Sequence, residues 1–205
     1  RPGWMTTKED AYFFDQNNRL LRGKYSVGGN YYIFDFETGA MVVSEYRKIG
    51  NTTYYAQSNG VIFDSWRCEK MIDWMLQHER SRSNVRYSMT SRYLNPNLDC
   101  SSSVYFALKS AGFISQDHFI GNTETLFKEP ILKEIYDFKD VRRGDIFIMG
   151  IEGQSMGGYG HTGIFYDKDK VIHCNYRNNG ITIDDYRYVL DGKRSNAERY
   201  FRIIV

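Results

Sequence analysis

One cysteine and two histidines carry the clearest chemistry in this sequence. Cys100 stands between an aspartate and a run of serines, and His161 and His173 lie twelve positions apart in the C-terminal third. A thiolate nucleophile needs a base, and the base needs a partner that fixes its orientation. The two histidines can fill these roles, so we expect a Cys–His–His constellation in which Cys100 is the nucleophile.

The residues around Cys100 predict a helix that would present its thiol. Asp99 is a favourable N-cap, and Gly112 is a favourable helix stop. In the first turn of a helix the backbone N–H groups carry partial positive charge, which favours a thiolate over a thiol. We therefore expect Cys100 to lie in the first turn of a helix between Asp99 and Gly112.

Both histidines fall in short segments that are typical of β-strands. Residues 161–166 and 171–176 flank a tight turn at residues 168–170. On two such strands His161 and His173 would lie near the same end of a sheet, where one imidazole can hydrogen-bond the other and fix its tautomer. The spacing thus predicts a pair of interacting imidazoles.

Further elements ahead of and beside these strands indicate the fold class. Residues 143–149 and 200–205 predict two more strands, and the apolar spacing over residues 69–80 predicts an amphipathic helix. His78 belongs to that helix and is expected at the surface rather than in the site. Helices followed by short strands with tight turns indicate an α+β fold with an antiparallel sheet.

The three cysteines also allow other interpretations. Zinc coordination by Cys100, the two histidines and Cys174 is one, but the spacing contains no CxxC or HxxxH pair. Strand alternation also places His173 and Cys174 on opposite faces of the sheet. An odd number of cysteines in a chain of this size does not favour a disulfide framework, and Cys68 and Cys174 are expected to be buried small residues. We expect no metal and no cofactor.

Composition limits the classes of partner. The 205 residues include 27 Lys and Arg against 25 Asp and Glu, a net charge of +2, which gives no electrostatic reason to expect a nucleic-acid partner. We find no apolar run of the roughly 20 residues that a membrane span needs. The length suits one domain and a smaller module, which we place at residues 66–205 and 1–65.

The N-terminal module is a repeat. Its Gly-Asn pairs at residues 29–30 and 50–51 are 21 residues apart, and aromatic residues alternate with polar ones around them, which predicts a β-hairpin array of about two and a half units. The aromatic residues either only hold the hairpins together or form a surface for a carbohydrate or a quaternary amine. Five tyrosines are the candidates for such a binding surface: Tyr12, Tyr25, Tyr32, Tyr46 and Tyr55.

This module resembles the choline-binding and glucan-binding cell-wall repeats. The resemblance lies in Tyr-Tyr-x-Phe at residues 31–34 and Gly-x-Met at residues 39–41. In that family the cation–π contact to choline comes from tryptophan, and we place Tyr25 and Tyr46 at the tryptophan positions. The resemblance implies a ligand in the cell wall, either a choline-type group or a glycan. Because tyrosines replace the tryptophans, a module that binds no ligand is the further alternative.

Four ordered blocks in the rest of the chain resemble the phage peptidoglycan hydrolase family of Pal-like amidases, within the papain-like superfamily of NlpC and CHAP domains. The blocks lie at residues 99–103, 143–148, 160–165 and 172–176. The resemblance implies a papain-like fold with a nucleophile helix, preceded by the all-β hairpin module. It implies that Cys100 is the nucleophile, His161 the general base and His173 the residue that orients it.

The same resemblance implies further site residues. Tyr87 matches a tyrosine that lines the substrate groove ahead of the nucleophile, and Asp99 and Ser101 flank the nucleophile as substrate-binding candidates. Because CHAP relatives use Asn or Glu as the third catalytic member, Asn175 is a second candidate for that role. The loops at residues 81–98 and 150–160 are expected to shape the substrate pocket.

The function implied is that of a cell-wall lysin whose partner is bacterial peptidoglycan. The resemblance favours cleavage between N-acetylmuramic acid and L-alanine, and relatives with the same triad cut within the stem peptide instead. A wall-binding module with an inert catalytic domain is the alternative of another class, and transfer of the acyl group to an amine is a third. The expected location is extracellular, at the wall, and a phage or prophage origin fits.

Overall fold

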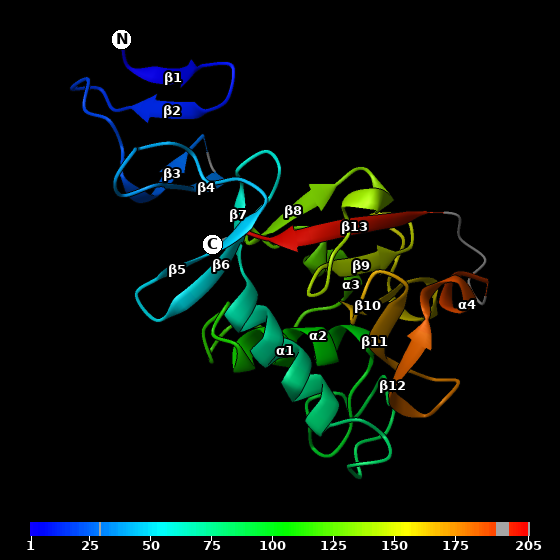
Figure 1. Cartoon of the computed structure of the whole chain (residues 1–205). Helices are drawn as coiled ribbons and strands as arrows, with labels where there is room; N and C mark the ends of the chain where they lie inside the picture. The colour runs from blue at the N-terminus through cyan, green and yellow to red at the C-terminus, as the bar shows by residue number, and fades with distance from the viewer. Residues whose placement is uncertain (29, 192–196, 205) are drawn as a thin grey trace. The chain divides into compact units, whose positions relative to one another are not determined.

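The computed structural model describes residues 1–28, 30–191 and 197–204, and it divides the chain into two compact units (Figure 1). The first comprises Arg1–Trp66 together with Ile204, and the second comprises Arg67–Ile203. Gly29, which we placed in a predicted turn, and Val205, which we placed in the last strand, lie outside the described residues. Helix and strand content is mixed, as the sequence predicted.

The first unit consists of small antiparallel hairpins. The sequence predicted about two and a half repeats, but the described residues form three small sheets, two of two strands and one of three. Gly3–Thr6 supplies a first strand for the copy that we recognised only by its tail. The strands are β1 (Gly3–Thr6), β2 (Ala11–Phe14), β3 (Gly23–Val27), β4 (Asn30–Phe34), β5 (Glu45–Ile49), β6 (Thr52–Ala56) and β7 (Ile62–Asp64).

The register of the hairpins corrects one prediction. The second paired residue of each first strand is Trp4 in β1, Lys24 in β3 and Tyr46 in β5. Lys24, not Tyr25, therefore stands at the position of Trp4. Sequence comparison alone misplaced it by one residue, because β3 begins pairing at Gly23, directly before the lysine. The three equivalent positions thus hold an indole, an ammonium group and a phenol.

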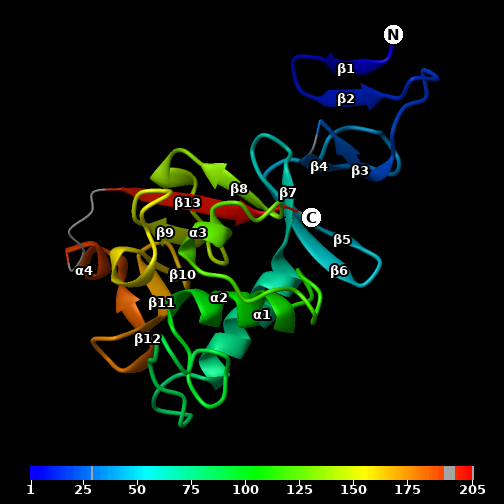
Figure 2. The ribbon, with the colours of Figure 1, turned by 180° about the vertical axis from the view of Figure 1, so that it is seen from behind.

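The second unit is built on a six-stranded sheet. Its order is β12-β11-β10-β9-β13-β8, and every neighbouring pair is antiparallel. β8, β13 and β9 lie side by side in both views of the ribbon (Figures 1 and 2). The strands are β8 (Leu132–Ile135), β9 (Ile146–Met149), β10 (His161–Phe165), β11 (Lys170–Asn175), β12 (Gly180–Asp185) and β13 (Glu198–Ile203).

Four α-helices and two 3-10 turns complete the described elements. They are α1 (Ser65–Gln77), α2 (Cys100–Ser110), α3 (Thr123–Leu126), α4 (Tyr186–Asp191), η1 (Phe138–Asp140) and η2 (Gly157–Tyr159). The helix predicted at residues 69–80 starts earlier and ends at Gln77, so His78 follows it. His78 is half-buried, and its ring stacks on Trp74 at 4.0 Å between centroids, so it is not the surface residue that we expected.

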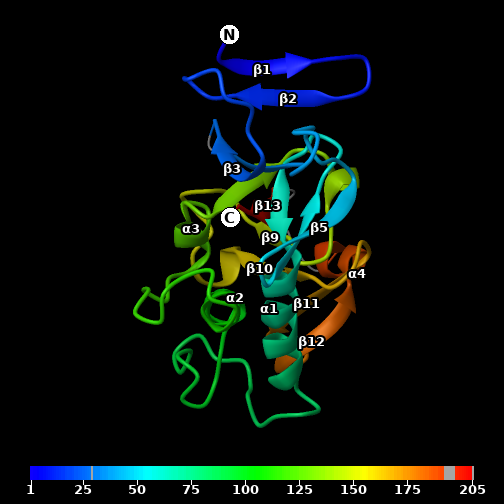
Figure 3. The same ribbon diagram turned by 60° about the vertical axis from the view of Figure 1, so that its left-hand side comes forward.

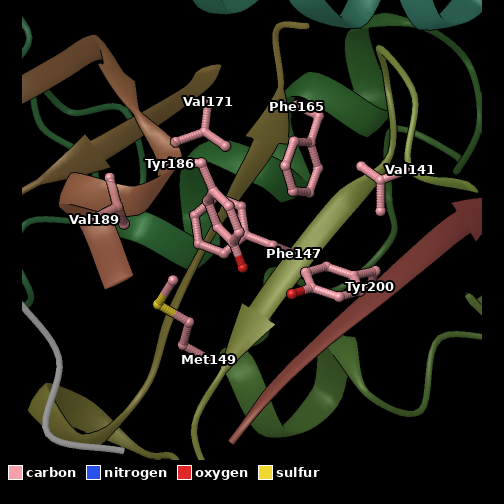
Figure 4. Close-up of a cluster of buried hydrophobic side chains, with 8 residues drawn as sticks. All are labelled: Val141, Phe147, Met149, Phe165, Val171, Tyr186, Val189 and Tyr200. Atoms are coloured by element: carbon pink, nitrogen blue, oxygen red, sulfur yellow. The ribbon is translucent and has the colours of Figure 1, made fainter. Parts of the chain in front are cut away.

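The core of the second unit lies on the sheet. A cluster on one side joins residues of β9, β10, β11 and β13 to α4, which follows β12 directly (Figures 3 and 4). Phe147 and Phe165 are completely buried there, and truncating such a side chain costs about 3–5 kcal/mol of folding stability. Helix α2 packs against β10 and β11, so the sheet gives both histidine strands and the nucleophile helix a rigid support.

Two ion pairs explain the block at residues 143–148. Asp145 is buried and accepts hydrogen bonds from Arg202 at 2.9 and 2.6 Å, which tie the start of β9 to β13. Arg143 donates to both carboxylate oxygens of Glu69 at 2.7 and 2.9 Å, which holds the same segment to α1. This block therefore holds the sheet and α1 together, and the site residues come from the other three blocks.

Candidate functional site

Cys100 is the first residue of α2, as predicted. The side chain of Asp99 accepts a hydrogen bond from the backbone N–H of Ser102 at 2.7 Å, and the Ser102 hydroxyl accepts one from the Asp99 N–H at 2.9 Å. This capping box fixes the helix start, and Gly112 follows the helix with a φ of 75°. Cys100 is 6% exposed, so its side chain is largely shielded from solvent at the N-terminal end of the helix, where the helix dipole is positive.

Arg92 fastens the preceding loop to this helix. Its guanidinium pairs with the Asp99 carboxylate and donates to the Ser101 hydroxyl at 2.9 Å and to the Gly121 carbonyl at 2.6 Å. The Ser101 hydroxyl in turn donates to Asp99 at 3.2 Å. The two predicted substrate-binding residues beside Cys100 thus form an internal network with Arg92, a residue that the sequence analysis missed.

The two histidines are in direct contact. Nε2 of His161 and Nδ1 of His173 are 2.6 Å apart, and the rings are nearly perpendicular, with 4.9 Å between centroids. Both side chains are buried in neighbouring antiparallel strands. The imidazole pair predicted from the spacing is therefore present.

Gly163 gives the second ring its space. A Cβ at this position would lie 2.6 Å from the Cβ of His173 and 2.8 Å from the ring of Phe147. A side chain there would push β11 away from β10 and separate the imidazoles. The glycine two residues after His161 therefore permits the contact.

Asp184 extends the pair into a chain of three groups. Its Oδ2 lies 2.9 Å from Nε2 of His173 and also accepts hydrogen bonds from Thr182 at 2.6 Å and Asn178 at 3.2 Å. The hydrogen bond from His173 is the main reason that the pKa of Asp184 is lowered. An ionised Asp184 accepts a hydrogen bond from Nε2–H of His173. Nδ1 of His173 is then left to accept a hydrogen bond from Nε2–H of His161. The chain therefore selects the His161 tautomer whose Nδ1 carries the lone pair.

Asp184 was not among the site residues predicted from the sequence. The alternation in β12 places Thr182 and Asp184 on one face, and Thr182 is paired with His173 in the sheet. This alternation places the Asp184 carboxylate on the same face of the sheet as His173. The sequence alone does not reveal this, because the pairing of β12 with β11 must be known first. Asn175, the predicted second candidate for this role, lies 3.4 Å from His173 Nε2 and makes its shorter bond, at 2.8 Å, to Thr182.

Two cavities adjoin the site, and Tyr87 and Met89 line both of them. A small cavity of about 170 Å³ includes Cys100 and the polar residues Arg92, Asp99, Ser101, Asn122 and Thr123. A larger cavity of about 470 Å³ includes His161, His173, Asp184, Tyr176, Arg177 and Tyr188. The nucleophile candidate and the histidines thus line neighbouring cavities with a common wall, which comes from the predicted loop at residues 81–98. The predicted loop at residues 150–160 lines each cavity through different glycines.

Tyr87 is the most informative residue of the common wall. Burial, together with the negative charges of Cys100 and Asp99, raises the pKa of Tyr87. Its phenol is therefore protonated at neutral pH and can donate a hydrogen bond into the site. The Tyr176 ring contacts it edge-on, with 5.9 Å between centroids.

The other two cysteines are buried in different surroundings. Burial is the main cause that raises the pKa of Cys174, whose thiol donates to the Leu98 carbonyl at 3.4 Å. A protonated, enclosed thiol is a poor nucleophile. Cys68 is 4% exposed in α1. Across residues 1–28, 30–191 and 197–204, no three His, Cys, Asp or Glu side chains gather as a metal site requires.

The five predicted tyrosines of the hairpin unit do not form one site. Tyr32 contacts Trp4 at 5.1 Å between ring centroids, and Trp4 also contacts Phe13 at 5.1 Å and Phe34 at 6.0 Å. Tyr46 and Tyr55 form a separate pair at 4.9 Å. Tyr25 is half-exposed, and the Tyr12 hydroxyl lies 3.5 Å from Asp10.

Trp4 and Lys24 are the residues of this unit that the sequence analysis passed over. The Trp4 indole is 46% exposed at the centre of its aromatic group. The Lys24 ammonium lies over the rings of Tyr31 and Tyr54, at 4.8 and 4.5 Å, and donates to the Tyr54 hydroxyl at 3.0 Å. One aromatic group is therefore open at the surface, and another is occupied by a cation of the chain itself.

Comparisons with known proteins give a family match, a phage relative and several solved structures. The lysin of Pneumococcus phage Dp-1 is 41% identical over 124 residues, which are 58% of this chain and 40% of that protein. The chain thus covers about two fifths of this relative. Of the solved structures, CbpJ from Streptococcus pneumoniae TIGR4 matches 31% of this chain and 21% of its own, at 25% identity and a TM-score of 0.29.

The choline binding domain of Spr1274 from Streptococcus pneumoniae matches 31% of this chain and 84% of its own, at 24% identity and a TM-score of 0.29. TM-scores this low do not establish a shared fold. Within the part of the chain that the structure describes, no helix has the length and apolarity to cross a bilayer. The family model for bacteriophage peptidoglycan hydrolases matches residues 67–204, nearly the whole second unit. The chain belongs to the bacteriophage peptidoglycan hydrolase family.

Proposed function

We propose that the second unit is a cysteine-dependent amidohydrolase of peptidoglycan with Cys100, His161 and His173 as its catalytic residues. The observation that carries the proposal is the hydrogen-bonded chain from His161 through His173 to Asp184, in a cavity adjoining that of Cys100. A base that is oriented and tied to a carboxylate serves a nucleophile in many hydrolases. Family membership supplies the substrate class.

The first half of the reaction forms a thioester. Nδ1 of His161 takes the thiol proton, and the sulfur of Cys100 attacks the amide carbonyl carbon. The negative charge that develops on the carbonyl oxygen is stabilised by the backbone N–H of Cys100 and by the protonated hydroxyl of Tyr87. His161 then gives its proton to the amide nitrogen, and the C–N bond breaks to release the amine.

The second half hydrolyses the thioester. A water molecule gives a proton to Nδ1 of His161 and attacks the same carbonyl carbon, and the Cys100 thiolate leaves. In both halves the imidazolium of His161 is held by His173, whose other ring nitrogen is bonded to Asp184. Asp184 thus positions the base through His173 and does not touch the reacting atoms.

The bond we favour is the amide between N-acetylmuramic acid and L-alanine, and cleavage within the stem peptide by the same residues is the alternative. The fold we propose for residues 66–205 is papain-like, supported by a nucleophile helix packed on an antiparallel sheet. The site of action we propose is the bacterial cell wall, outside the cytoplasm.

We further propose that residues 1–65 hold the enzyme on the wall. The exposed Trp4, with Tyr32 beside it, is the best-supported contact for a choline-type group or a glycan. Attachment through this unit would raise the effective concentration of substrate at an insoluble wall. Removing residues 1–65 should then reduce lysis of cells more than cleavage of soluble fragments.

Mass spectrometry of fragments released from purified peptidoglycan tests the catalytic proposal. Cys100→Ser should abolish release, whereas Cys68→Ser and Cys174→Ser, which alter the two other thiols, should retain it if they fold. New L-alanine amino termini on whole stem peptides would establish the amidase, and new termini inside the stem would establish the endopeptidase. Release that persists in Cys100→Ser would disprove the cysteine mechanism. No release by the unaltered protein would favour an inert wall-binding module.

A further inference from the structure

The two cavities of the site differ in size and chemistry. The small one contains Cys100 among polar groups and has a volume of about 170 Å³. The large one contains His161, and at about 470 Å³ it falls within the usual range of ligand pockets. A substrate that spans both cavities would place different chemical groups in each.

The proposed chemistry fixes which half of the substrate lies in which cavity. His161 must reach the amide nitrogen to protonate it, so the amine half leaves on the side of the large cavity. The carbonyl carbon must lie against Cys100, so the first atoms of the acyl half belong in the small cavity. The large cavity therefore binds the leaving amine half. The charge and polarity of the side chains that line this cavity determine which groups on that half it favours.

Arg177 gives the large cavity a cation. Its guanidinium lies over the Tyr188 ring at 4.3 Å from the centroid, and both residues line the cavity. A guanidinium over an aromatic ring keeps N–H groups that can bind a planar anion. Among the residues that the structure describes, Arg177 makes no ion pair.

The carboxylate in the same cavity does not neutralise this cation. Asp184 is engaged by His173, Thr182 and Asn178, and no hydrogen bond joins it to Arg177 within the described part of the chain. The exposed ring of Tyr176 adds apolar surface next to Arg177. The large cavity thus offers an aromatic wall with one positive charge.

We propose that Arg177 binds a carboxylate carried by the leaving half of the substrate, so that this half is an acidic peptide. The proposal rests on the proposed function, because the direction of the leaving amine follows from the role of His161. It makes Arg177 and Tyr188 specificity-determining residues, and it favours an amine half with a free carboxylate close to the scissile bond, as a stem peptide with an acidic second residue has.

Two muropeptides test this, identical except that the free carboxylate of the second stem residue is a carboxamide in one of them. Binding is measured by calorimetry to the full chain carrying Cys100→Ala, so the result does not depend on turnover. We expect the carboxylate form to bind about tenfold more tightly, a preference that falls with added salt. Arg177→Ala should abolish the preference by weakening only the carboxylate form, and Arg177→Lys should keep part of it.

Arg187→Ala is the matched control, since Arg187 is an exposed arginine next to Tyr188 that does not line the cavity. It should leave the preference unchanged. Equal binding of the two muropeptides, or a preference that survives Arg177→Ala, would overturn the proposal. Absence of cleavage by the unaltered protein would instead count against the proposed function, so the two failures are distinguishable.

Discussion

The two units of this protein use aromatic and polar side chains in opposite ways. In the hairpin unit, strands such as β1 and β5 bury no residue fully, and large rings such as Trp4 and Tyr46 stay exposed. In the second unit, every residue of β9 and β10 is buried, including His161. The hairpins share only a small buried cluster that includes Ile33, Val42 and Ile62, so several of their rings stay available for a surface ligand, whereas a packed sheet holds imidazoles at fixed distances.

The difference bears on the roles that we propose for the two units. Contacts made by half-exposed rings tolerate small shifts, but the orientation of His161 depends on a hydrogen bond of 2.6 Å to His173, which is itself held by one of 2.9 Å to Asp184. Substitutions in the chain of His161, His173 and Asp184 should therefore change turnover on any substrate. Substitutions in the first unit should change only the retention of the enzyme on whole walls.

Asp184→Asn provides the largest expected effect. The amide cannot supply the charge that holds the His173 tautomer, so kcat should fall about a hundredfold or more on soluble muropeptides and walls alike. Steady-state kinetics on a soluble muropeptide checks this. Asp185→Asn is the matched control, since Asp185 is the exposed next residue of β12, and its kcat should remain unchanged. If Asp184→Asn kept the kcat of the unaltered protein, Asp184 would have no role in orienting the catalytic histidines.

The same variant also changes how stability depends on pH. The pKa of Asp184 is lowered in the folded chain, so the carboxylate contributes stability above its unfolded pKa and loses it as the pH falls through its folded pKa. Asp184→Asn lacks this contribution. Its free energy of unfolding should therefore fall less on acidification than that of the unaltered protein, as urea titrations at several acidic pH values would reveal.

Trp4→Ala provides an intermediate effect that is confined to the first unit. Loss of the exposed indole from its contacts with Phe13, Tyr32 and Phe34 should weaken wall binding about tenfold. Cleavage of a soluble muropeptide should stay unchanged. Sedimentation of the protein with purified walls measures the first quantity. Equal retention of the variant and the unaltered protein would mean that these rings only hold the hairpins together.

Lys24→Met should give the smallest change. The methionine keeps an apolar chain over Tyr31 and Tyr54 but removes the cation and the hydrogen bond to Tyr54. Urea unfolding followed by tyrosine fluorescence should report a loss of about 0.5–1 kcal/mol in the stability of the first unit. An unchanged midpoint would show that the internal cation has no structural value. Activity on soluble substrate should not change.

The parts of the fold that were predicted well are those set by neighbours in the sequence. Asp99 and Gly112 marked the ends of α2, and the residues between the two histidines marked a hairpin, because caps and turns are made by residues a few positions apart. The hairpins of the first unit were also visible, but their register was not. Tyr25 was predicted at a position that Lys24 occupies, since strand pairing depends on partners that local sequence does not specify.

The remaining site residues come from distant parts of the chain. Arg92 reaches Asp99 and Gly121 from a loop without regular structure, and Asp184 joins the histidines only because β12 pairs with β11. The Arg177 guanidinium lies over the ring of Tyr188 on the following helix. Each of these contacts depends on the packing of the whole sheet.

The sequence by itself determined that a cysteine begins a helix and that two histidines lie on adjoining strands twelve positions apart. Those features follow from hydrogen bonds and turns within short stretches of chain. The tertiary structure decided which carboxylate completes the histidine chain, which cavities adjoin Cys100 and which aromatic groups stay open. Those depend on strand order and register, which are set by burial over the whole unit.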